Sequence, residues 1–146
     1  MTVDMRSFLR QIKKTNDLFI VKKRVSTKYE IAAVTAKLDG SKAALFENIK
    51  GSKFRLVSNL VGSRARFGQA IGSKKSGINQ KIVRAISSAK KPKISATAKF
   101  FENSSKNIST LPIVTHFQNE SGPFITSSIL YTRNQEKKSQ NSSFHR

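Results

Sequence analysis

The side chains that carry most enzyme chemistry are scarce in this 146-residue chain. It has two histidines, His116 and His145, no cysteine, and eight carboxylates that are scattered along the sequence. No acidic pair or cluster of metal ligands stands out, and the lack of cysteine excludes disulfides and thiolate metal sites. An isolated histidine in a β segment is more often structural than catalytic, and we interpret His116 in that way. The generic catalytic templates therefore do not fit.

One short segment could bind an anion. Gly62 and Ser63 precede Arg64 and Arg66 at a predicted helix start, where backbone amides and two guanidinium groups could hold a phosphate. The alternative is an ordinary helix cap followed by solvated arginines, and we favour it. The basic runs at 22–24 and 90–91 are equally brief and are typical of solvated faces.

Two segments near the carboxyl end are more distinctive. The first contains Pro112, Thr115, His116, Gly122, Pro123, Phe124, Ile125 and Thr126, and the second contains Asn141, Ser143, His145 and Arg146. In order and spacing they resemble the UbiD-type decarboxylases, which use prenylated flavin mononucleotide (prenylated FMN) to remove CO2 from unsaturated acids. The first hundred residues agree more loosely, at 6–9, 29–33, 45–46 and 59–64. With histidine rather than tyrosine at position 145, the chain is most similar to an archaeal branch proposed to convert trans-anhydromevalonate 5-phosphate to isopentenyl phosphate.

The resemblance implies roles for the last six residues. Asn141 would bind Mn2+ or Mg2+, because an amide oxygen is a hard neutral ligand that suits such ions. Arg146 would be the catalytic residue, since its planar fork can clamp a substrate carboxylate or the flavin edge. The cofactor contacts would come from Ser143, Phe144, His145 and Arg146. The family also implies a homo-oligomer and a flavin prenyltransferase that supplies the cofactor.

The same resemblance places other site residues outside this sequence. The family's remaining metal ligands, a histidine and a glutamate, and its acidic proton donor lie beyond the matching position of residue 146. Glu102, Glu120 and Glu136 do not stand in the matching motifs, so we assign none of them as the catalytic acid. We therefore expect a fragment or truncated reading frame of a larger decarboxylase, inactive by itself.

Helix and strand signals alternate along the first ninety residues. Asp4 can cap a helix through about Lys14, and Thr27 with Glu30 forms a capping box for a second helix that ends at Asp39-Gly40. Further helices are predicted between Ser63 and Gly72 and along 78–86. The predicted strands are 18–25, 43–49 and 54–61, with a turn at 50–51 between the last two. This alternation predicts an α/β or α+β domain.

The composition changes after Lys106. Residues 107–132 contain no lysine or arginine, one acidic residue and two of the three prolines. We therefore predict an amino-terminal α/β domain over 1–106, which includes a connecting segment at 92–107, and the start of a split β-barrel flavin-binding domain over 107–146. Its first strands are predicted at 123–132 and from Ser142, joined by a polar loop at 133–140.

The charge balance leaves two other classes of function open. The 28 Lys+Arg against 8 Asp+Glu give a formal charge of +20, which attracts any polyanion. A basic nucleic-acid-binding module is therefore one alternative, although the few aromatic residues lie in apolar runs and we expect no sequence-specific recognition. A non-catalytic partner subunit is the other. No apolar run is long enough for a signal peptide or membrane span, so we expect a cytoplasmic protein.

Overall fold

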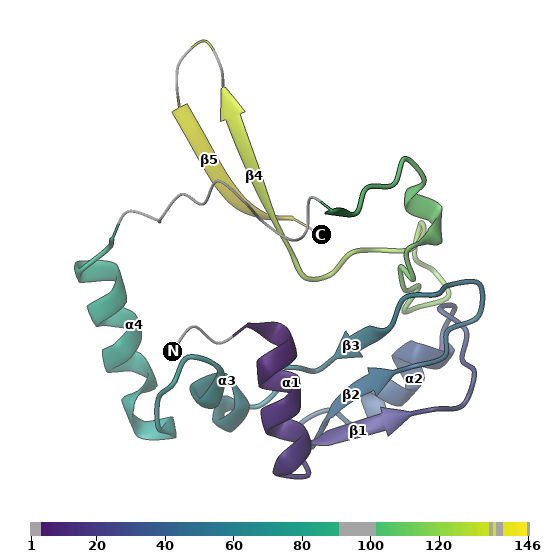
Figure 1. Ribbon diagram of the computed structural model, residues 1–146, viewed down its shortest axis with the longest axis horizontal. Coiled ribbons are helices and arrows are strands. Elements are labelled where there is room, and N and C mark those ends of the chain that lie inside the picture. Colours follow the sequence, from purple (N-terminus) through teal and green to yellow (C-terminus); the bar gives the residue numbers. More distant parts are fainter. Residues whose placement is uncertain (1–3, 91–101, 135, 137–138, 146) are drawn as a thin grey trace.

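The computed structural model of the chain describes residues 4–90, 102–134, 136 and 139–145. A mixed three-stranded sheet, flanked by helices, forms its compact part, and a two-stranded hairpin projects away from it (Figure 1). The predicted α/β class is confirmed, and the described residues form no closed barrel. None of the described helices is both long and apolar enough to cross a membrane.

Helix α1 (Met5–Lys14) begins where the sequence predicts. The Asp4 carboxylate accepts hydrogen bonds from the backbone N–H groups of Arg6 and Ser7 and from the Ser7 hydroxyl. These bonds, above all that from the Ser7 backbone, lower the pKa of the Asp4 carboxyl below its ordinary value. Phe8 and Ile12 are buried one turn apart, so this helix has one apolar face against the sheet.

The sheet has the strand order β1-β2-β3, with β1 (Leu18–Val21), β2 (Ala43–Phe46) and β3 (Leu56–Ser58). The first pair is parallel and the second is antiparallel. Strands β1 and β3 are shorter than predicted, and β2 also ends early, at Phe46. The predicted turn lies between β2 and β3, where Gly51 adopts a φ of 79°. A positive φ of this kind favours glycine, because it lacks a Cβ.

Apolar residues on the two faces of the sheet form two separate cores. Leu18, Ala43 and Leu45 pack with Phe8 and Ile12 of α1. Alternate residues point to the opposite face, where Val21, Ala44 and Phe46 pack with Ile31 of helix α2 (Glu30–Lys37). The sheet therefore lies between α1 and α2, as Figure 1 shows.

The predicted capping box at the start of α2 is wrong. The N-cap residue is Tyr29, with a φ of 68°, and the Glu30 carboxylate accepts the backbone N–H of Ser26 rather than that of Thr27. The reason is a long-range contact, because the Tyr29 N–H donates to the Thr115 carbonyl and the Thr115 N–H donates to the Thr27 carbonyl. Tertiary pairing therefore fixes this turn in place of the local box.

Helices α3 (Arg64–Ala70) and α4 (Ile78–Ser87) follow the predicted positions closely. Two 3-10 turns that the sequence did not predict are η1 (Lys75–Gly77) and η3 (Ile108–Thr110). Ser63 caps α3 through the backbone N–H of Arg66, and Gly72 ends it with a φ of 66°. Ile78 is buried at the start of α4, whereas Ile82 and Ile86 are exposed. Most of the predicted connecting segment lies outside the described residues.

Candidate functional site

The predicted site residues other than Arg146 lie on the last strand of the hairpin formed by β4 (Ser128–Asn134) and β5 (Ser139–His145). The two strands are antiparallel, and Figure 1 shows them away from the three-stranded sheet. Both differ from the predicted bounds, since β4 starts later and runs on to Asn134 and β5 starts at Ser139. Polar residues at 133–134 and 139–140 continue the ladder, because a hairpin with exposed faces tolerates them.

The hairpin register divides the predicted site residues between two faces. Asn141 pairs with Thr132 and Ser143 pairs with Leu130, so both side chains leave the same face of β5. Phe144, which pairs with Ile129, leaves the opposite face. Asn141 and Ser143 could therefore contact one ligand together, whereas Phe144 would contact something on the other side of the strand.

The backbone of His145 pairs with Ser128 at the end of the ladder, and Arg146 lies outside the described residues. The roles assigned to these two residues, and those of Asn141, Ser143 and Phe144, remain predictions.

Apolar side chains are exposed on both faces of the hairpin. Phe144 is 87% exposed, and Ile129 and Tyr131 beside it are 67% and 63% exposed. Leu130, on the face of Asn141 and Ser143, is 46% exposed. Tyr131 donates a hydrogen bond from its hydroxyl to the Gln140 side chain across the strands. A two-stranded hairpin is marginally stable alone, so these side chains are suited to packing against further structure.

The first distinctive segment joins the hairpin to the compact part of the chain. Val114 is buried in the core cluster beside α2, and Thr115 forms a parallel bridge with Lys28. Phe124 returns to this segment and donates its backbone N–H to the Val114 carbonyl at 3.1 Å. The segment 112–116 thus pairs with the turn that precedes α2 in the amino-terminal fold.

His116 takes part in a local turn. Its backbone N–H donates to the Glu120 carboxylate at 2.7 Å, and its ring lies 6.4 Å from that of Phe117. The Glu120 carboxylate thus closes this turn through its hydrogen bond with the His116 backbone. Glu102 and Glu136 are exposed. These contacts support the structural interpretation of His116 and give no reason to assign any of these glutamates as a catalytic acid.

The donor groups on the hairpin fit a metal site only in part. An exposed amide oxygen at Asn141 and a hydroxyl at Ser143 suit a hard cation such as Mn2+. Within the described ranges, however, no group of three His, Asp or Glu side chains could hold a metal ion. The described residues therefore offer only part of a ligand set, and a complete site needs ligands from elsewhere.

The candidate anion-binding segment at 62–66 proves to be structural. Ser63 caps α3 and Arg64 is exposed, where it donates to the Asn79 side chain at 3.1 Å. The expectation of two solvated arginines is wrong for Arg66, which is 2% exposed and donates to the carbonyls of Ser41 and Asn59. Its guanidinium joins two loops and is not available to a ligand.

Comparison with protein families gives two matches that adjoin along the chain. Residues 9–86 match the 3-octaprenyl-4-hydroxybenzoate carboxy-lyase N-terminal domain, UbiD_N. Residues 88–146 match the Rift-related domain of the same carboxy-lyases, UbiD. A search of curated proteins gives no match.

Solved structures agree with this result. The UbiD-class enzyme HmfF from Pelotomaculum thermopropionicum, in complex with FMN, is 29% identical over 94% of this chain, with a TM-score of 0.85. The vanillic acid decarboxylase of Sedimentibacter hydroxybenzoicus, in open form, is 25% identical over 95% of the chain, with a TM-score of 0.72. The 3,4-dihydroxybenzoic acid decarboxylase AroY of Klebsiella pneumoniae, at 18% identity and a TM-score of 0.84, shares the fold. The chain spans about a third of each, namely 32%, 32% and 34% of their lengths.

Proposed function

Because this chain belongs to the UbiD family of carboxy-lyases, we propose that it supplies the amino-terminal part of a prenylated-FMN-dependent decarboxylase. The reaction would be the non-oxidative removal of CO2 from an α,β-unsaturated carboxylic acid. In this proposal, residues 1–106 form the amino-terminal α/β domain and residues 107–146 begin the split-barrel cofactor-binding domain.

The observation that carries the proposal is the order of the two family matches. They follow one another over 9–86 and 88–146, so the chain has the two domain types in sequence. HmfF, which is similar in structure over 94% of this chain, was solved with FMN and, in an evolved dimeric form, with prenylated FMN. These relatives support a flavin-dependent decarboxylase rather than an unrelated α/β protein.

Strand β5 would provide this chain's share of the cofactor site. Asn141 would bind the Mn2+ or Mg2+ ion, and Ser143 on the same face would hydrogen-bond to the cofactor beside it. His145 and Arg146 would complete the contacts at the end of the strand, and Phe144 would pack on the other side. Prenylated FMN, when bound, accepts the electrons left by CO2, so these residues would chiefly hold and orient it.

Arg146 would be the catalytic residue of this segment. Its guanidinium stays charged at any working pH and can form two parallel hydrogen bonds to a carboxylate, which fixes the substrate in one orientation. The candidate substrate is trans-anhydromevalonate 5-phosphate, which the histidine at position 145 suggests. The surplus of 20 positive charges is consistent with a phosphorylated acid, since it attracts anions in general.

Two further parts of the proposal concern partners. The enzyme would act as a cytoplasmic homo-oligomer and receive its cofactor from a flavin prenyltransferase. The competing functions are a basic nucleic-acid-binding module, favoured by the net charge of +20, and a non-catalytic partner subunit.

A chimera tests the proposed function. It joins residues 1–146 to the part of HmfF that follows the matched region, and its far-UV circular dichroism is compared first with that of HmfF. We expect prenylated FMN to be retained and an unsaturated acid to be decarboxylated, with trans-anhydromevalonate 5-phosphate in the substrate panel. Arg146→Lys should keep the cofactor but lose more than tenfold in activity, about 1.4 kcal/mol in the barrier. A folded chimera without cofactor would contradict the proposal.

A further inference from the structure

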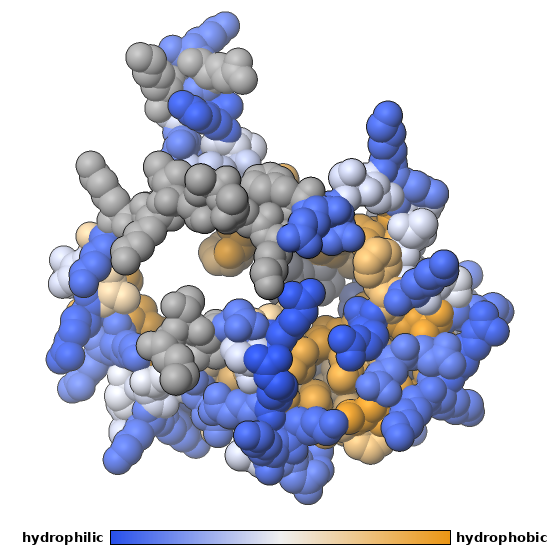
Figure 2. Space-filling model, viewed as in Figure 1, coloured by the Kyte–Doolittle hydropathy of each residue, from blue (hydrophilic) through white to orange (hydrophobic). Residues whose placement is uncertain are grey.

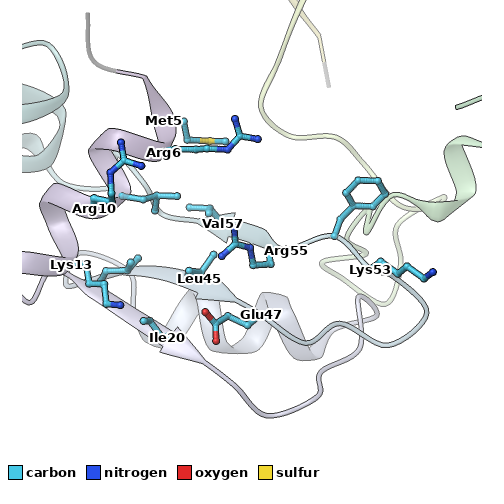
Figure 3. A pocket seen from close by; sticks show the side chains of 13 residues that line it. Met5, Arg6, Arg10, Lys13, Ile20, Leu45, Glu47, Lys53, Arg55 and Val57 are labelled. Atoms are coloured by element: carbon cyan, nitrogen blue, oxygen red, sulfur yellow. The ribbon is translucent and has the colours of Figure 1, made fainter. Parts of the chain in front are cut away.

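A pocket lies between α1 and the open face of the three-stranded sheet, far along the chain from the hairpin. Its volume is about 530 Å³, which is in the range of small-molecule sites. The floor is a row of one residue from each strand, because Ile20 pairs with Leu45 and Leu45 pairs with Val57. The close-up in Figure 3 shows these three side chains in the pocket.

The two outer residues of this floor remain accessible because α1 covers only part of the sheet, whereas Leu45 between them is buried. Phe8 and Ile12 pack over one end of the strands, while Ile20 and Val57 stay half-buried. Met5 and Phe54 form exposed walls, with exposed fractions of 59% and 51%. Figure 2 shows the result as a hydrophobic area beside α1, bordered by hydrophilic side chains.

Positive side chains surround this apolar floor. Three come from α1 and two from the segment that leads into β3, namely Arg6, Arg10, Lys13, Lys53 and Arg55. Glu47 is the one carboxylate in the lining, so five cations face a single negative charge. Such a surplus around a low-dielectric surface concentrates the electric field and attracts anions.

Arg6 and Arg55 are the best placed of these cations. In Figure 3, Arg55 lies in the middle of the pocket, and Arg6 extends from α1 over the same space. Both are exposed, and within the described part of the chain neither guanidinium has an ion pair or a hydrogen-bond acceptor. Guanidinium groups bind carboxylates and phosphates through paired hydrogen bonds, and these two have that capacity free.

We propose that this pocket binds a small amphipathic anion, an apolar chain or ring that carries a carboxylate or phosphate. The apolar body lies on the row of Ile20, Leu45 and Val57, and the anionic head is held by Arg6 and Arg55. Both parts of the ligand are required, because the floor offers no polar partner for the anionic head and the guanidinium groups offer no apolar surface for the chain or ring. The site is independent of strand β5 and of the proposed decarboxylase chemistry.

Isothermal titration of the 146-residue chain with decanoate and with decyl phosphate tests this site. We expect saturable binding of one molecule per chain, and the tighter of the two identifies the preferred head group. Decanol, which lacks the charge, and inorganic phosphate, which lacks the chain, should each bind at least tenfold more weakly. If decanol bound as tightly as the alkyl anions, the site would be an apolar surface without selectivity for charge. If inorganic phosphate bound as tightly, the binding would come from diffuse positive charge alone. Either result overturns the proposal.

Exposed residues provide the variants, so that folding is kept. Arg6→Gln and Arg55→Gln should each weaken decanoate binding about tenfold, whereas Arg84→Gln on α4 removes the same charge away from the pocket and should change it less than twofold. Phe54→Ser should weaken the binding of decanoate and of decyl phosphate without changing the binding of inorganic phosphate. Equal effects of Arg84→Gln and Arg55→Gln, or no saturable binding to a chain with wild-type circular dichroism, would refute the site.

Discussion

Replacement of Arg66 tests the structural role of a buried charge. Its guanidinium donates to the Ser41 carbonyl at 2.5 Å and to the Asn59 carbonyl at 3.3 Å. The Asn59 carbonyl also accepts a hydrogen bond from the Gly62 N–H. Among the described residues, Arg66 is the only donor to the Ser41 carbonyl. Arg66→Met keeps an unbranched side chain but leaves the Ser41 carbonyl without a partner.

The expected cost follows from these contacts. A hydrogen bond from a charged donor contributes about 1.5–3 kcal/mol, and the longer second bond adds less. Removal of the buried cation also relieves a desolvation cost, which offsets part of the loss. The free energy of unfolding should therefore fall by about 2–3 kcal/mol, equivalent to roughly 8–24 °C in Tm if the cooperative unit is a domain of about 60–100 residues.

The measurement is urea and thermal unfolding followed by circular dichroism. Arg64→Met is the matched control, because it removes the same group two positions away from an exposed site with one contact to Asn79. It should stay within about 0.5 kcal/mol of wild type. Equal stabilities of the two variants would refute the argument that the Arg66 hydrogen bonds hold the loops together.

Three other predictions use separate features of the chain. The lowered pKa of the Asp4 carboxyl means that its contribution to stability as a helix cap is complete above the ordinary value of 3.8 and is lost as the pH falls through the folded-state pKa. Asp4→Asn keeps an acceptor but does not titrate, so the variant should lose this part of the fall in Tm with acid. A fall in Tm equal to that of wild type would contradict the prediction. The isolated 146-residue chain, supplied with prenylated FMN and Mn2+, should decarboxylate no unsaturated acid, because Asn141 and Arg146 cannot hold the cofactor alone; turnover of any acid would disprove this. Unrelated RNA and DNA sequences should bind with similar affinities that collapse together as salt rises, and one sequence bound far more tightly at physiological salt would favour a nucleic-acid-binding module.

Local signals in the sequence were sufficient for much of the fold. Asp4 and Ser63 each supply a side-chain oxygen to the first turn of the helix that follows, so α1 and α3 begin where the caps predict. Glycines with positive φ, such as Gly51 and Gly72, mark turns for the same local reason.

Features that depend on distant residues were missed. The start of α2 is set by pairing between Tyr29 and Thr115, which lie 86 positions apart by residue number. Arg66 is buried because carbonyls of two other loops surround it, and no local pattern distinguishes it from Arg64.

The same limit applies to the two sites. The sequence located the β5 motif, but only the hairpin register separates Asn141 from Phe144 by face. The pocket beside α1 went unrecognised, because its floor comes from three strands and its cations from two separate segments. The spacing of Arg6, Arg10 and Lys13 along one side of a helix is the signal that could have indicated it.

The most direct test of the central claim compares two adjacent residues of β5 in the chimera with HmfF. Asn141 and Ser142 leave opposite faces of the strand, so alanine at each removes a polar group from only one face. Bound manganese and prenylated FMN are measured by metal analysis and visible absorbance after gel filtration. We predict that Asn141→Ala loses both, whereas Ser142→Ala retains them at wild-type levels. Full retention by Asn141→Ala would contradict the assignment of this strand to the cofactor site.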